Sequence, residues 1–84
     1  MALAMADDDH ERARAALQRG EVLPLAEILA RVQAELAGEV IATELEREHR
    51  RWVYELKLID PVGRIVELEV DAADGRILHS ELDD

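Results

Sequence analysis

Carboxylates are the most abundant reactive groups in this chain, and one pair of them has a spacing that could support chemistry. The chain contains 20 Asp and Glu residues. Glu67 and Glu69 stand two residues apart in an alternating segment, so both should project from the same face of a strand. General acid–base catalysis uses such pairs of carboxylates. Their neighbours are solvated residues and the sequence indicates no pocket, so a charged outer sheet face is the favoured interpretation.

The other groups that could do chemistry form no recognised motif. His10, His49 and His79 match no zinc-ligand spacing, and the acidic run Asp7–Asp9 lacks the pattern of a calcium loop. The sequence has no cysteine. Neither its single serine nor its single threonine lies in a nucleophile motif. We therefore predict no catalytic residue, no metal site and no cofactor, and we expect that the protein is not an enzyme.

Length and charge narrow the class of partner. Eighty-four residues form one small domain. The net charge of −10 argues against binding to phosphate backbones or to an anionic membrane surface. No apolar run approaches the roughly 18–20 residues of a membrane span, so we expect no direct membrane insertion. A protein partner, basic on its contact surface, fits this charge best.

The first part of the chain predicts two helices. A short helix should run from about residue 10 to residue 19 and end at Gly20, with a thin apolar face of Ala13, Ala16 and Leu17. A second helix should begin after Pro24 and close at Gly38. Its apolar residues recur at helical spacing and form one stripe, which needs an apolar sheet to cover: Leu25, Ile28, Leu29, Val32 and Leu36.

The rest of the chain predicts a sheet. The segment Glu39–Glu48 is β-like, and alternating apolar residues follow from Trp52 to Ile59 and from Ile65 to Val70. Turns are expected near Glu48-His49-Arg50, at Asp60–Gly63 and at Ala72–Gly75. The predicted fold is α+β: two N-terminal helices followed by an antiparallel β-meander of three to four strands, with the second helix packed on one sheet face. The other face is solvated or is paired with a partner.

Several short segments of the meander carry a family resemblance. They are Tyr54-Glu55-Leu56, the Asp60–Gly63 turn, and Val70-Asp71 followed by Asp74–Leu78. Upstream, Leu23–Leu29 and then Gly38 look like the helix that precedes such a sheet. With these elements the chain resembles the PepSY domain family over roughly residues 22–82. Many members have Thr before the turn glycine where this chain has Asp74, which also favours turns.

The resemblance implies a small, non-catalytic module that is usually found outside the cytoplasm. Residues 10–84 are then a single PepSY-like domain with a family-like core at 22–82. Residues 1–9 are interpreted as a leader remnant or cloning scar plus a helix N-cap, and are expected to be disordered. A periplasmic or extracellular location follows, with the signal peptide removed.

The predicted function is a non-catalytic protein-binding module that modulates or inhibits an extracytoplasmic peptidase or a sensor protein. The alternative is a structural, self-assembling small protein. The thin first helix and the small core would then be stabilised in a homodimer.

Aromatic and basic residues near the start of the second strand are the predicted protein interface. Tyr54 is expected in the core by strand alternation. Trp52 stands beside Arg50 and Arg51, and it is either a core residue or an interface anchor at the sheet rim. With Arg47 these residues form the only basic patch. This patch either pairs across a hairpin with Glu44, Glu46 and Glu48 or meets the acidic tail of a second chain.

Overall fold

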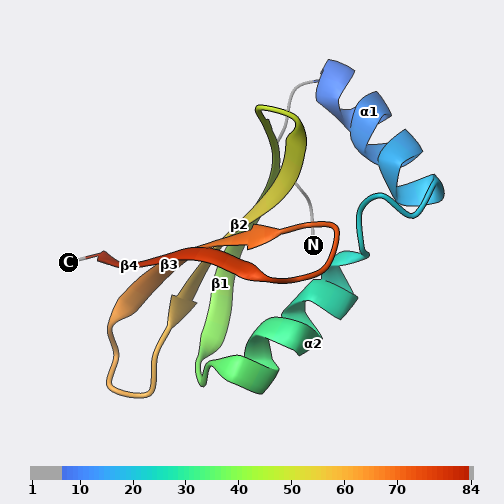
Figure 1. Cartoon of the computed structure of the whole chain (residues 1–84). Coiled ribbons are helices and arrows are strands. Elements are labelled where there is room, and N and C mark those ends of the chain that lie inside the picture. Colours follow the sequence, from blue (N-terminus) through green and yellow to red (C-terminus); the bar gives the residue numbers. More distant parts are fainter. Residues whose placement is uncertain (1–6, 84) are drawn as a thin grey trace.

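The protein is described by a computed structural model that covers residues 7–83. Within that range two helices precede four strands that form one antiparallel sheet in the order β1-β2-β3-β4 (Figure 1). The predicted α+β fold is confirmed, and its meander has four strands. The elements are α1 (Asp7–Gln18), α2 (Leu25–Glu35), β1 (Glu39–Glu48), β2 (Arg51–Ile59), β3 (Ile65–Asp71) and β4 (Ile77–Asp83).

Two short turns set the register of the first three strands. Glu48 pairs with Arg51 around a two-residue loop, in which His49 takes a positive φ of 55°. Ile59 pairs with Ile65 around the second turn, where Gly63 has a φ of 87° that favours glycine. Because residues equidistant from a turn face each other across a hairpin, these two turns determine which side chains become neighbours.

The Asp60 carboxylate holds the second turn together. Its Oδ1 accepts hydrogen bonds from the backbone N–H groups of Val62 (3.0 Å) and Arg64 (2.8 Å). Its Oδ2 accepts a hydrogen bond from Nε of Arg64 at 2.8 Å. These donors stabilise the ionised carboxylate and so lower the pKa of Asp60. The hydrogen bond from the Arg64 backbone is the largest cause. The predicted turn therefore forms through local side-chain bonds as well as through proline and glycine.

The core lies between the helices and one face of the sheet. The apolar stripe predicted for α2 is confirmed, since Ile28 and Val32 are buried and the other stripe residues pack against the core. The strands contribute alternate residues from that face, as the period of two requires. The buried core residues are Ala13, Ala16, Val22, Ile28, Val32, Leu45, Trp52, Tyr54, Leu56, Leu58, Leu68, Val70 and Ala72.

The linker between the helices is fixed to the sheet at Leu23. The Tyr54 hydroxyl donates a hydrogen bond to the Leu23 carbonyl at 3.0 Å. The Leu23 N–H donates to the carbonyl of Ala72 at 2.8 Å, and the Ala72 N–H donates to the carbonyl of Trp52 at 3.0 Å. Tyr54 is only 2% exposed, as predicted for a core residue. Burial raises the pKa of its hydroxyl, which stays neutral and able to donate.

The first helix is longer than predicted and contributes little to the core. It begins at Asp7 rather than His10, so the three acids occupy its first turn, where the helix dipole favours negative charge. The predicted N-cap role of Asp7–Asp9 depends on side chains that the structure does not describe. The predicted disorder of residues 1–6 likewise lies outside the described residues. Ala13 and Ala16 are buried while Leu17 remains 44% exposed. Gly20, with a φ of 75°, follows the helix end as predicted.

The turn between β3 and β4 is clamped against α2. Arg31 on α2 donates a hydrogen bond from Nη1 to the carbonyl of Asp74 at 2.7 Å. Gly75 lies directly beneath its side chain, and a Cβ there would come within 2.7 Å of Cδ of Arg31. Gly75 also has a φ of 80°. The turn glycine therefore allows both the backbone conformation and the close approach of the helix.

We predict that Tyr54→Phe lowers the free energy of unfolding by about 1–2 kcal/mol, because the Leu23 carbonyl loses its donor in a part-buried position. Urea denaturation measures the loss. Hydrogen exchange localises it, since the Leu23 N–H should lose more protection than amides in the middle of β2, which lose only what the lower global stability removes. An unchanged midpoint would contradict the role given to this hydrogen bond.

We also predict that Gly75→Ala destabilises the protein more than Gly63→Ala. Both glycines have φ near 80–90°, so alanine adds a similar backbone strain of about 1–2 kcal/mol at either site. A Cβ at Gly63 meets nothing within 4 Å, whereas one at Gly75 meets Arg31. The excess, about 1 kcal/mol in urea denaturation, should shrink in an Arg31→Ala background, which removes Cδ and Cγ but keeps Cβ, 3.3 Å from the added Cβ. Equal losses at the two glycines would refute the clamp.

Candidate functional site

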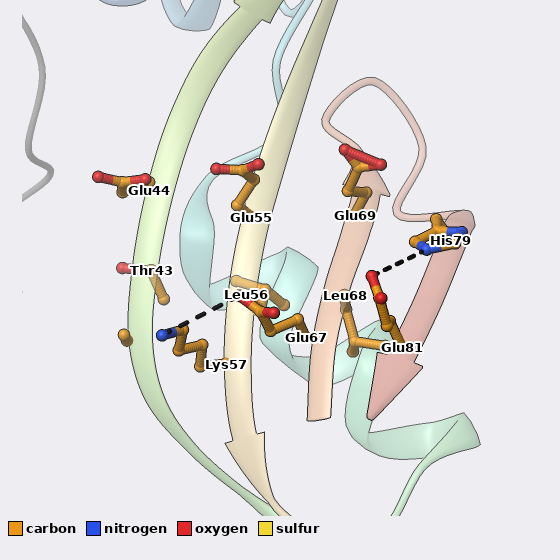
Figure 2. A pocket seen from close by; sticks show the side chains of 11 residues that line it. Thr43, Glu44, Glu55, Leu56, Lys57, Glu67, Leu68, Glu69, His79 and Glu81 are labelled. Carbon is orange, nitrogen blue, oxygen red and sulfur yellow. Dashed lines mark ion pairs between the residues drawn. The ribbon is translucent and has the colours of Figure 1, made fainter. Parts of the chain in front are cut away.

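The sheet face turned away from the helices is strongly acidic. Strand alternation and register place its side chains opposite to those of the core. Figure 2 shows α2 behind the sheet and the charged side chains in front. The basic groups on this face, among the described residues, are Arg51, Lys57 and His79. Its acids are Glu39, Glu44, Glu46, Glu48, Glu55, Glu67, Glu69, Asp71, Glu81 and Asp83. We call this surface the open face.

Three carboxylates form a row across the open face. Glu44 on β1 pairs with Glu55 on β2, Glu55 pairs with Glu69 on β3, and Glu69 pairs with His79 on β4. Figure 2 shows the three glutamates level with one another on successive strands. Neighbouring strands are about 4.8 Å apart, and like charges directly opposite each other destabilise a sheet. We call Glu44, Glu55 and Glu69 the carboxylate row.

Glu55 is the centre of the negative charge. Its carboxylate lies within 4.8 Å of those of Glu44 and Glu46, and equally of those of Glu48 and Glu69. The pKa of Glu55 is raised to about 7. Partial burial is the largest cause, and the charge and hydrogen bonding of Glu46 come next, followed by the charges of Glu44 and Glu48. Each of these disfavours the ionised form, so Glu55 accepts a proton near neutral pH.

The basic groups of the open face form ion pairs with acids that are not part of the carboxylate row. Nζ of Lys57 lies 4.0 Å from Glu67 and 3.9 Å from Asp83. Arg51 pairs with Asp71 at 3.8 Å and His79 pairs with Glu81 at 3.5 Å. Among residues 7–83 no ion pair involves a member of the carboxylate row. Within residues 7–83, the basic groups of the open face therefore pair with other acids and not with Glu44, Glu55 or Glu69.

Two adjoining hollows lie along the open face. The first contains the carboxylate row together with Lys57, Glu67 and His79 (Figure 2). The second lies toward the β1–β2 turn and is lined by Glu48, Arg50, Arg51 and Glu69 around the apolar side chains of Val53 and Leu78. Val53 is only 3% exposed, although strand alternation directs it away from the core. The second hollow thus has a small apolar floor that two acids and two arginines border.

This arrangement favours electrostatic binding over catalysis. Groups of carboxylate oxygens attract hard cations and basic side chains. The pair Glu67 and Glu69 does lie on one face, as predicted, and both line the first hollow, which is broadly open to solvent. A catalytic pair needs a cleft that orients a substrate and excludes water. We therefore interpret the open face as a contact surface.

The residues predicted as an interface are not on one surface. Trp52 is buried at 6% exposure and packs in the core, and the guanidinium of Arg47 lies 5.2 Å from the centroid of its ring. Both border a groove beside α1. Arg50 lies in the β1–β2 turn and Arg51 on the open face. The basic patch was predicted to pair across the hairpin with Glu44, Glu46 and Glu48. The register places one such pair opposite each other, Glu48 and Arg51. The interface role of these four residues stays a prediction.

The three histidines are far from forming a common site. His10 lies on α1, His49 in the β1–β2 turn and His79 on β4, and all three are exposed. This agrees with the interpretation that they are surface residues. His79 nevertheless gains a local role, because it continues the carboxylate row and pairs with Glu81 on its own strand.

Sequence reasoning missed the carboxylate row, although the signal was present. It recognised that Glu67 and Glu69 share a face but did not compare positions across the turns. Glu44 and Glu55 are equidistant from the His49-Arg50 loop, and Glu55 and Glu69 are equidistant from the second turn. Placing both turns therefore suffices to bring the three residues into line. The raised pKa of Glu55 depends on this two-sided crowding and on partial burial, which spacing along one strand does not reveal.

Fold and open face together define a small helix-backed sheet module with a charged contact surface. The family model described as peptidase propeptide and YPEB domain (PepSY) matches residues 22–81, well over half of the chain. The chain belongs to the PepSY family. Domains of this family are generally propeptide or regulatory modules of peptidases, are typically non-catalytic, and occur in extracytoplasmic proteins.

No curated protein and no solved structure gives a significant match to the chain. Neither α1 nor α2, the helices within residues 7–83, has the length and apolar character needed to cross a membrane.

We predict that Glu55→Gln raises the free energy of unfolding above pH 7. The folded-state pKa of about 7 exceeds the ordinary value of 4.5, so the folded protein binds the proton more tightly than the unfolded chain. The stability from this group is fully present below about pH 4.5 and is lost as the pH rises through 7. The variant should therefore be more stable than the wild type by roughly 1 kcal/mol at pH 8, after allowance for solvent screening, and equally stable near pH 4.

Chemical denaturation of both proteins across this pH range measures the difference. Glu35→Gln on the exposed side of α2 removes the same charge and is the matched control. A pH-independent difference for Glu55→Gln, or the same pH profile for both variants, would contradict the crowding at Glu55.

Proposed function

We propose that this PepSY protein is a non-catalytic protein-binding module that modulates or inhibits an extracytoplasmic peptidase or a sensor protein through its open face. The observation that carries the proposal is the carboxylate row, three directly opposed acids on a sheet face that no described helix covers. Like charges in register cost stability. A partner that supplies positive charge would relieve that cost on binding.

Family membership supports the peptidase or regulatory context, since PepSY domains associate with peptidases as propeptide or regulatory modules. We place the protein in the periplasm or outside the cell for the same reason. Arg50 and Arg51, which were predicted as interface residues, border the open face at the β1–β2 turn, and we include them in the proposed contact surface. Trp52 and Arg47 lie on the other side of the sheet, where they contact each other and border the groove beside α1.

The alternative of a self-assembling dimer gains less support. Two copies of the open face would bring their acids together, because this face carries more than three times as many acidic as basic groups. The exposed large apolar residues within residues 7–83 are also scattered. Leu17 lies on α1, Ile41 on β1, Val62 in the second turn and Leu82 on β4, so they give no continuous patch for a second copy.

Site-specific photocrosslinking tests the proposed function. A photoreactive amino acid at Glu67 on the open face should capture a peptidase or a sensor protein in an extracytoplasmic fraction. The same group at Gln33, exposed on α2, is the matched control and should not. Added to the captured protein, the purified chain should lower its peptidase or signalling activity several-fold at saturation. Equal capture from both positions, or capture of a second copy alone, would contradict the proposal.

A further inference from the structure

We infer that the open face binds a Lys- and Arg-rich segment of the partner protein, which seats its cationic groups on the carboxylate row and its aliphatic stems on the Val53–Leu78 floor. This inference rests on the proposed function and specifies the chemistry of the partner. It goes beyond family membership, which says nothing about the charge of the surface that the domain recognises.

Charge complementarity is the first argument. Ten carboxylates share the open face with three basic groups, and the basic groups pair with acids outside the row. The excess spans three strands, which is broader than the reach of one cation. A segment with several positive charges matches this breadth, and guanidinium groups bind carboxylates through two parallel hydrogen bonds.

The apolar floor is the second argument. Val53 and Leu78 line the hollow that adjoins the row, with Glu48 and Glu69 at its edge. Lys and Arg side chains have long aliphatic stems that pack on apolar surface while the charged head stays in a polar setting. Arg50 and Arg51 also border this hollow, so a stem on the floor would direct its charged head toward Glu48, Glu69 and the row. A nucleic acid, by contrast, would be repelled by the acids.

Proton linkage at Glu55 gives the inference a specific readout. The charged groups that face Glu55 are Glu44, Glu46 and Glu48 from β1 and Glu69 from β3, with Arg51 and Lys57 on its own strand and His79 at the end of the row. A cationic group seated among these acids favours the ionised form of Glu55. Binding should therefore release a proton near neutral pH and become tighter as the pH rises.

The test is a titration of the full chain with a synthetic peptide of about seven residues, comparable to one strand, in which arginine alternates with alanine. The same peptide with glutamine in place of arginine is the control ligand, and Mg²⁺ or Ca²⁺ alone is a further probe. Calorimetry gives the affinity and the protons released, and amide shifts in NMR spectra locate the contact. We expect binding of the arginine peptide, with shifts on the open face.

Two triple variants with equal changes in net charge separate a site from general attraction. The first replaces the carboxylate row, Glu44→Gln, Glu55→Gln and Glu69→Gln. The second replaces exposed helix acids, Glu11→Gln, Glu27→Gln and Glu35→Gln. Loss of three contacts should weaken binding by on the order of tenfold or more in the first variant and by less than about twofold in the second. Glu55→Gln alone should abolish the release of protons.

Several results would overturn the inference. They are equal weakening in the two triple variants, amide shifts centred on the Trp52 groove, or a divalent cation that binds the row while the arginine peptide does not bind. The mapping with wild-type protein decides the question even if a variant misfolds. A peptide that fails to bind while Glu67 still crosslinks a peptidase or sensor refutes this inference and leaves the proposed function standing. Failure of the crosslinking refutes the proposed function itself.

Discussion

The buried hydroxyl of Tyr54 imposes a constraint that organises the rest of the molecule. A buried hydroxyl needs a hydrogen-bond partner, and the Leu23 carbonyl supplies it at 3.0 Å. Leu23 also donates its N–H to the carbonyl of Ala72, so the linker between the helices is fixed both to β2 and to the residue that follows β3. The start of α2 is thereby set over the core face. With the helices committed to that face, the opposite face is left to solvent or to a partner.

Stability and binding make opposing demands on the open face. Ionised Glu44, Glu55 and Glu69 weaken the pairing of β1, β2 and β3, in a domain whose small size limits the core. Partial protonation of Glu55 near neutral pH reduces this cost. The fold can retain the row because burial of α2 and the bonds at Leu23 stabilise the sheet from behind. Elements on one face thus permit an otherwise unfavourable charge pattern on the other.

The sequence predicted the elements well because their signals are local. Pro24, Gly38 and the turn residues at 60–63 act within a few positions, and each limits the boundaries of its neighbours. The first residue of α1 was harder to predict from the sequence, since three consecutive acids suit both an N-cap and a first helical turn. Trp52 was ambiguous for another reason. Its position beside Arg50 and Arg51 suggested a rim, whereas the tertiary placement of α1 and the contact with Arg47 bury it. The carboxylate row required pairing across two turns, which a residue-by-residue inspection does not provide.

The length of the two-residue loop His49-Arg50 helps to determine which acids lie side by side on the open face. Because the loop fixes which residue of β1 faces Glu55, the acidic row is specified by the length of a connection as much as by the acids themselves. Deleting one loop residue would slide β1 along β2 and direct Glu44 and Glu46 toward the core side, although no acidic codon had changed. Relatives that keep every glutamate but differ in this loop would therefore differ in what they recognise, and a comparison of acidic positions alone would overlook the change.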